Sequence, residues 1–454
     1  MISGMARKFV VIIGLTALLS PSLVWGQAES NEDSQPTDAV PVIDDAPCPP
    51  DSEDCNAGEA LAYEGDEQEE DAAASSSKSV EADLAEDNKL KPAVFPIDPI
   101  ESRLDRFYKF KDRVQEATGL KWGVDYTVLL QHASFTESGD DTASSSVFRI
   151  LGTWMDAGDR DKAHGKLVWK IETRNPIFGN PTPRDMGFDT GSALSTANFK
   201  ELDWGVTDFY WAQRFNRGEH AFLFGHMDPG DWADQYPGLN AWTSFMSDAF
   251  YNNPTEAIPK RGFGIVGQTF FTDNLYLMGG AHDANGKDGN LDFGSFWNDR
   301  EWFKWVEFGY RGSKRNIAAR HNVHLHYWHQ DEREEAAVEK SHGWAFTYSV
   351  KNDRGGMAFL RAGHSKGDAA QMRRFIGGGG TIKVKGRDTL GMAVSWGSPP
   401  DKSLRDQVTG EIYYRIQVTQ NLTISPNWQL TLHPSFTLEK RWISVPGLRM
   451  RLVF

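Results

Sequence analysis

The sequence predicts an all-β protein, a transmembrane antiparallel β-barrel of about 16 strands, preceded by a short amphipathic helix and a disordered acidic tail. Three observations support this prediction. From Leu120 to Phe454 the chain repeatedly alternates apolar and polar residues, which places one set of side chains on each face of a strand. The candidate strands are close to the ~10 residues that a tilted membrane strand requires. The connectors between them are alternately short and long, as in outer-membrane barrels.

The first residues have the pattern of a secretory signal peptide. Arg7 and Lys8 precede an apolar stretch at 9–19, and small residues around Gly26 offer a cleavage site. The apolar stretch is too short to span a membrane. We therefore expect residues 1–28 to be a signal peptide.

An acidic segment follows, and we expect residues 29–97 to be a disordered linker. Residues 29–91 contain twenty acids and three lysines, whereas residues 92–454 are neutral overall. Such a segment cannot bury enough apolar surface to offset its ordering entropy. The neutral body offers no basic patch for nucleic acid. Cys48 and Cys55 are expected to form a local disulfide in an oxidising periplasm, with metal binding as the alternative.

A helical pattern begins at Pro99 and stops at Gly119. Apolar residues such as Leu104 and Phe107 recur there at helical spacing. We expect a periplasmic helix over 98–119 that packs beside the barrel. A plug and an oligomerising helix are the alternatives.

The barrel domain is expected to cover residues 120–454. Its strand candidates are 120–132, 145–157, 164–175, 203–215, 219–227, 262–271, 273–283, 302–313, 318–330, 342–351, 356–365, 372–384, 387–397, 409–420, 426–437 and 444–454. If the first strand starts in the periplasm, every second connector should be short. The connectors at 216–218 and 385–386 fit, with Gly and Asn turn chemistry. The other set, including 176–202 and 228–261, is longer.

The stretch from Gly410 to Gln420 shows the two faces most clearly. Ile412 would face lipid, whereas Glu411 and Arg415 would face the lumen. Charges on the lipid face near mid-membrane would cost ~2–4 kcal/mol each. About sixteen strands also enclose an aqueous channel rather than a packed core.

Several sequence stretches share the patterns of one family. They are Gly225–Asp231, Phe245–Phe250, Asn253–Pro254, Ile258–Pro259, Gly262–Gly264, Gly279–Gly286, Glu411–Thr419 and Ser425–Gln429. From about Gly225 to its end the chain thereby resembles the carbohydrate-selective porin (OprB) family of bacterial outer membranes. The resemblance implies a monomer or homotrimer in outer-membrane lipid, without a cofactor, that passes small sugars by diffusion and is constricted by inward-folding loops. The long acidic tail departs from the family pattern.

A pore that selects sugars needs hydrogen-bond donors and acceptors for the hydroxyls, and aromatic faces for the apolar ring faces. Binding must stay weak, because passage requires release. The lumen candidates are Glu411, Tyr413, Arg415, Gln417, Asn427, Gln429, His433, Arg361, Glu307, Lys170, Glu172, Asp208 and Arg214. The third outer loop adds Asp231, Trp232, Asp234, Tyr236 and Trp242 as a constriction. The alternative is that these residues only make the channel wall hydrophilic or pair with neighbouring side chains.

Two other functions compete with a sugar channel. His324 and His326 share one face of a strand, as in a metal site or an outer-membrane hydrolase. No Gly-x-Ser-x-Gly motif accompanies them, so neither a metal nor catalysis is expected. The stretch Asp283–Gly289 resembles a calcium loop but lacks the closing Glu, which favours a polar outer loop.

The second function that competes with a sugar channel is that of a general, unselective porin.

Overall fold

The computed structural model describes residues 78–454, except 90, 92, 96–97, 160, 195, 197, 238–239 and 313–320. These residues belong to one compact unit, 63–454. The predicted signal peptide, the residues 29–77 of the linker, Cys48 and Cys55 all lie outside the described residues.

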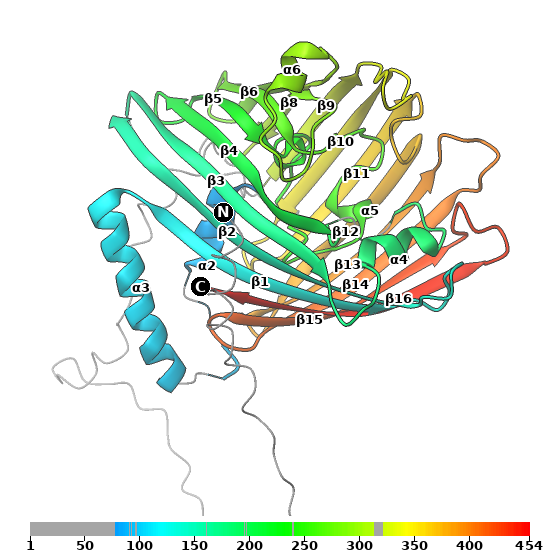
Figure 1. Ribbon diagram of the computed structural model, residues 1–454, viewed down its shortest axis with the longest axis horizontal. Coiled ribbons are helices and arrows are strands. Elements are labelled where there is room, and N and C mark those ends of the chain that lie inside the picture. The colour runs from blue at the N-terminus through cyan, green and yellow to red at the C-terminus, as the bar shows by residue number, and fades with distance from the viewer. Residues whose placement is uncertain are drawn as a thin grey trace, which may run out of the picture. The chain divides into compact units, whose positions relative to one another are not determined.

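Sixteen antiparallel strands in the described part close into one barrel, which confirms the predicted fold (Figure 1). Each strand pairs with its neighbours in sequence, and β1 pairs with β16. The strands are β1 (Lys121–His132), β2 (Thr142–Asp159), β3 (Ala163–Pro176), β4 (Leu202–Phe215), β5 (His220–Met227), β6 (Gly262–Phe270), β7 (Leu275–Asp283), β8 (Trp302–Arg311), β9 (His321–Gln330), β10 (Ser341–Lys351), β11 (Met357–Lys366), β12 (Arg374–Val384), β13 (Asp388–Ser398), β14 (Gln407–Gln417), β15 (Leu422–Leu432) and β16 (Trp442–Val453).

The closing strand has the two faces that its sequence predicts. Leu448 and Met450 are exposed on the outside, whereas Arg449 and Arg451 are buried inside. Leu130 of β1 pairs with Leu448, so the apolar rows of the first and last strands meet. Closure leaves no unpaired strand edge, which hydrocarbon would not tolerate.

The connectors sort by length as the sequence predicts. β4 and β5 are joined by the turn 216–219, and β12 and β13 by 385–387. At the opposite ends, 177–201 and 228–261 join β3 to β4 and β5 to β6. Short turns therefore gather at one end of the barrel, the periplasmic end in outer-membrane barrels.

The predicted bounds of one strand, 426–437, are wrong. β15 begins earlier, at Leu422, and ends at Leu432. Pro426, the first residue of the predicted range, lies inside the strand, opposite Leu448 of β16. Because Pro426 has no N–H to donate, the pairing with β14 is interrupted there and resumes at Ile424.

The predicted periplasmic helix is α3 (Asp98–Thr118), which runs alongside the end of the barrel in Figure 1. Phe107 packs edge-on against Trp122, with ring centroids 5.8 Å apart, and against Phe454 at 6.4 Å. Short helices in the long connectors are α4 (Pro183–Asp189), η3 (Pro229–Asp231), α5 (Asp248–Tyr251) and α6 (Gly294–Asn298). Among the described residues, no helix is both long enough and apolar enough to cross a bilayer.

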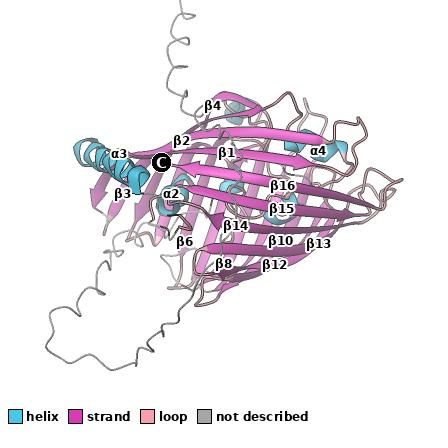
Figure 2. Cartoon of the chain, turned by 90° about the horizontal axis from the view of Figure 1, so that it is seen from below, coloured by secondary structure: helices cyan, strands magenta, loops and turns pink. Residues whose placement is uncertain are grey.

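The acidic segment is not disordered at its C-terminal end, where α2 (Val80–Asp87) forms. Ser79 caps this helix by accepting a hydrogen bond from the Ala82 N–H at 3.3 Å. This helix contacts β1, β2 and β3 and lies near the chain's C-terminus in Figure 2. The composition of the tail could not reveal this helix, because its partners are barrel residues far away in sequence.

Candidate functional site

The loop 228–261 between β5 and β6, here called the constriction loop, folds into the lumen. Trp232, Tyr236 and Phe245 are almost completely buried. Trp232 packs edge-on against Tyr210 of β4, with ring centroids 5.9 Å apart. Phe245 packs against Tyr413 of β14, with a centroid distance of 5.0 Å. The loop thus contacts separate parts of the barrel wall, and the predicted inward folding is present.

One buried acid fixes the loop to the β9–β11 wall. Asp234 contacts the Nε2 atom of His324 at 2.6 Å and accepts from the Thr347 hydroxyl at 2.7 Å. It also pairs with the Arg361 guanidinium. Burial alone would raise the pKa of Asp234, but Arg361 and His324 hold it well below its usual value. Arg361 is in the lumen, as predicted, and holds the loop there.

The predicted row on β14 also holds the constriction loop. Glu411 accepts from the backbone N–H groups of Met246 and Ser247, both at 2.9 Å. Arg415 donates to the Thr243 carbonyl at 3.3 Å, and Tyr413 lies at hydrogen-bond distance from Ser244. Glu411 and Arg415 thus bind the backbone of the loop, and Tyr413 contacts one of its side chains, so this row does not line an open surface.

The neighbouring predicted residues have local partners. Asn427 donates to Glu411 at 3.2 Å, and Gln429 donates to Thr196 of the infolded loop 177–201 at 3.2 Å. Gln417 donates to the Thr419 carbonyl at 2.8 Å. His433 is exposed beyond the end of β15, with φ at 53°. It therefore lies outside the regular alternation of β15, which ends one residue before it.

The four histidines of β9 divide between its two faces. His324 and His326 are buried inside, and His321 points outward. His326 lies 3.4 Å from both Glu256 of the constriction loop and Glu307 of β8. Glu307 also accepts from the Tyr276 hydroxyl at 2.6 Å. In the described part of the chain, no group of three or more metal-ligating side chains is arranged to hold an ion.

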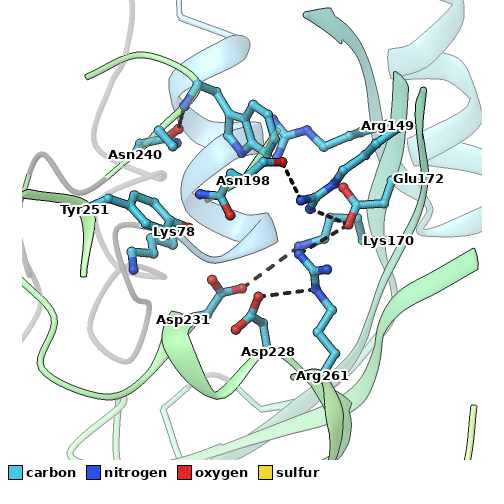
Figure 3. Close-up of a pocket in the computed structure, with 13 residues that line it drawn as sticks. Lys78, Arg149, Lys170, Glu172, Asn198, Asp228, Asp231, Asn240, Tyr251 and Arg261 are labelled. Atoms are coloured by element: carbon cyan, nitrogen blue, oxygen red, sulfur yellow. Dashed lines mark hydrogen bonds and ion pairs between the residues drawn. The ribbon is translucent and has the colours of Figure 1, made fainter. Parts of the chain in front are cut away.

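A narrow pocket, with ≈ 20 Å³ of space for the centres of water-sized molecules, lies between β2, β3 and the constriction loop (Figure 3). It is lined by Lys78, Arg149, Lys170, Glu172, Arg174, Asn198, Asp228, Asp231, Asn240, Ala241, Trp242, Tyr251 and Arg261. Both infolded loops contribute to this lining, as does the residue two positions before α2.

Charges in this pocket are paired. Glu172 lies 2.8 Å from Arg174 and 3.3 Å from Arg261. Arg261 also lies 3.2 Å from Asp228. The predicted residues Lys170 and Asp208 form an ion pair, and Asp231 is 4.0 Å from Lys170.

Aromatic faces complete the pocket. The Arg149 guanidinium lies 4.5 Å from the centre of the Trp242 ring, and that of Arg174 lies 5.5 Å from it. The Lys78 ammonium lies 3.9 Å from the centre of the Tyr251 ring. Such cation–π contacts hold a ring in a fixed orientation.

Sequence reasoning found part of this pocket. Lys170, Glu172, Asp231 and Trp242 were predicted, whereas Arg149, Arg174, Asp228 and Arg261 were missed. The alternation that placed Lys170 and Glu172 inward also places Arg174 inward, so that signal was available. Arg261 precedes β6 directly, and no periodic pattern assigns a direction to a loop residue.

Comparison with known proteins gives a consistent result. Residues 335–454 match the family model described as "Carbohydrate-selective porin, OprB family". No curated protein sequence matches the chain. The high-pH structure of Pseudomonas putida OprB is similar, with a TM-score of 0.60 at 15% identity, covering 77% of this chain and 97% of that chain. An engineered triple mutant of Rhodopseudomonas blastica porin is more distant, with a TM-score of 0.47 at 11% identity, covering 74% of this chain and all of that one.

The matched segment contains the last seven strands, β10 to β16. The family pattern thus covers the C-terminal part of the barrel, and the barrel fold is shared with Pseudomonas putida OprB. The predicted resemblance is thereby confirmed: over residues 335–454 the chain matches the carbohydrate-selective OprB porin family, and its barrel has the fold of Pseudomonas putida OprB.

Proposed function

We propose that small neutral sugars cross the outer membrane through the pocket beside Trp242. The observation that carries this proposal is the combination of paired charges and aromatic faces in that pocket. Sugars present hydroxyls that both donate and accept hydrogen bonds, and ring faces that stack on indole. Both kinds of group line the pocket, which is narrow enough that a passing sugar would have to touch them.

The pairing of charges favours a neutral solute over an ion. Glu172 stands between Arg174 and Arg261, and Lys170 stands between Asp208 and Asp231. A solute therefore meets donors and acceptors close together rather than a field of one sign. Weak, distributed contacts of this kind allow release as well as entry.

Liposome swelling tests the proposal. Liposomes with the full chain should swell in isosmotic solutions of neutral hexoses and pentoses faster than in solutions of uncharged polyols of similar size. Swelling rates that depend only on solute size would instead identify a general, unselective porin. Protein-free liposomes provide the baseline.

The oligomeric state belongs to this proposal as well. Large apolar side chains are exposed on the outer surface of strands around the barrel, for example Phe308, Leu325, Met392 and Leu448. A monomer would expose the whole belt to lipid, and a homotrimer would cover one sector of it. The mass of the protein–detergent complex by light scattering distinguishes the two.

A further inference from the structure

Helix α2 lies inside the barrel, although it belongs to the acidic segment. Val80 and Leu84 are buried in the same apolar cluster as Tyr210 and Trp232. The helix contacts β1, β2 and β3. Figure 2 shows it near the chain's C-terminus. This part of the lumen is therefore occupied by protein.

The carboxylate of Glu81 binds two strands at once. Its Oε1 atom lies 2.9 Å from the Lys166 ammonium of β3 and 2.8 Å from the Arg214 guanidinium of β4. Burial would raise the pKa of Glu81, but these two cations lower it to about 2. Glu81 is consequently ionised at any pH at which an outer membrane functions.

The other two inward acids of α2 bind guanidinium groups. Asp83 lies 2.9 Å from Arg149 of β2 and accepts from the Asn240 amide of the constriction loop at 2.7 Å. Asp87 accepts two hydrogen bonds from Arg451 of β16, at 2.8 and 2.7 Å. Bidentate pairs of this kind are specific as well as strong.

The residues before and after α2 also form hydrogen bonds, to the constriction loop and to the barrel wall. Lys78 donates to the Gly230 carbonyl at 3.1 Å and to Asn252 at 3.0 Å, both in the constriction loop. Val94 donates to the Gln417 carbonyl at 3.0 Å, at the short-turn end of β14. The segment therefore extends from the short-turn end of the barrel to the constriction loop.

The four barrel cations that meet α2 are here called the lumen cation band. They are Arg149, Lys166, Arg214 and Arg451. All four are at least nine-tenths buried, and they come from β2, β3, β4 and β16, which together with β1, between β16 and β2, form one sector of the barrel.

We propose that the lumen cation band is a carboxylate-binding site on the channel wall, and that the chain's own helix α2 occupies it as a tethered plug that limits passage. Release of α2 opens the path between the short-turn end and the pocket beside Trp242. The inference requires a conducting channel but does not depend on which solute passes.

Cysteine cross-linking tests whether α2 is docked in the lumen of the membrane-embedded barrel. The Leu84 Cδ2 atom lies 3.0 Å from the position that a Cβ atom on Gly123 of β1 would take. In a chain with Cys48→Ser and Cys55→Ser, the pair Leu84→Cys and Gly123→Cys should therefore cross-link with a short thiol-specific reagent. The matched control is Glu86→Cys with Gly123→Cys, because Glu86 is exposed on the other side of α2. Cross-linking no greater than in the control overturns the proposal.

Conductance tests whether docking limits passage. The full-length variant with Glu81→Gln, Asp83→Asn and Asp87→Asn should show an open fraction higher by on the order of tenfold, because the ion pairs that favour the docked state are lost. Glu86→Gln on the same helix should behave as the unmodified chain. Heat-modified migration in gels checks that each barrel has folded.

The two proposals fail in different ways. Equal conductance in the unmodified chain and in the triple variant, including none in either, overturns the plug. A triple variant that conducts more but swells liposomes without preference for sugars supports the plug and contradicts the sugar channel.

Discussion

At the scale of single residues, the pocket beside Trp242 depends on an acid between two guanidinium groups. In Glu172→Gln, Arg174 and Arg261 lose their shared carboxylate, so the pocket gains one positive charge. We expect the ratio of chloride to potassium permeability to rise. The reversal potential in a KCl gradient measures this ratio. Glu439→Gln, in the exposed connector between β15 and β16, should leave it unchanged.

The proposed sugar site includes the aromatic face of Trp242. In Trp242→Ala, block of the ion current by a neutral sugar should weaken by on the order of tenfold, because one stacking contact contributes about 1 kcal/mol. Titration of the current with glucose measures the block. The matched control is Trp428→Ala, on the outer face of β15 and 49% exposed. Unchanged block in Trp242→Ala would place the sugar elsewhere in the lumen.

At the scale of elements, the constriction loop depends on its buried anchors. Asp234→Asn removes the charge that pairs with Arg361 and contacts His324. The substitution leaves the buried guanidinium of Arg361 without its partner, which costs about 3–5 kcal/mol of folding free energy. We expect a looser loop, seen as a larger and noisier single-channel conductance and a lower midpoint in denaturant. Asp406→Asn, exposed in the connector before β14, should change neither quantity.

The docking of α2 should depend on pH through Glu81. Its pKa is about 2 when docked, against 4.5 for the free group, so its contribution is fully present above pH 4.5. That contribution is lost as the pH falls from 4.5 towards 2. Conductance of the unmodified chain should rise over this interval. Asp83, whose pKa is raised by burial despite Arg149 and Arg451, acts in the opposite direction.

The variant Glu81→Gln distinguishes the effect of Glu81 on the pH dependence of docking from that of Asp83. It retains Asp83, Asp87 and the lumen cation band but lacks the Glu81 titration. The acid-dependent rise should therefore be absent in Glu81→Gln, and its conductance at pH 6 should already exceed that of the unmodified chain. The same acid-dependent rise in both proteins would show that Glu81 does not hold the helix.

At the scale of the whole molecule, the sequence predicted the barrel because each strand needs only local information. Alternation in β14 places Ile412 outward and Glu411 inward wherever the rest of the chain lies. The same alternation in the closing strand places Leu448 and Met450 on the outer face and Arg449 and Arg451 on the inner face. The bounds of β15 were wrong because local alternation fixes the faces of a strand but not the residues at which it begins and ends.

The contents of the lumen could not be predicted in the same way. The side-chain direction of Glu411 follows from the sequence, but its partners, the Met246 and Ser247 N–H groups, follow only from the folding of a long loop. The contact between Asp87 and Arg451 joins residues 364 positions apart. Composition alone assigned α2 to a disordered segment, because its acids are stabilised by cations that no local pattern reveals.

Planar-bilayer recording of the folded, full-length chain tests the central claim most directly. That claim is that the closed barrel carries a continuous, water-filled path that neutral sugars share with ions at the pocket beside Trp242. The account predicts stepwise conductance that added neutral sugar reduces in a saturable way. A folded chain that gives no steps even with Glu81→Gln, Asp83→Asn and Asp87→Asn, or steps that are indifferent to sugar, would contradict it.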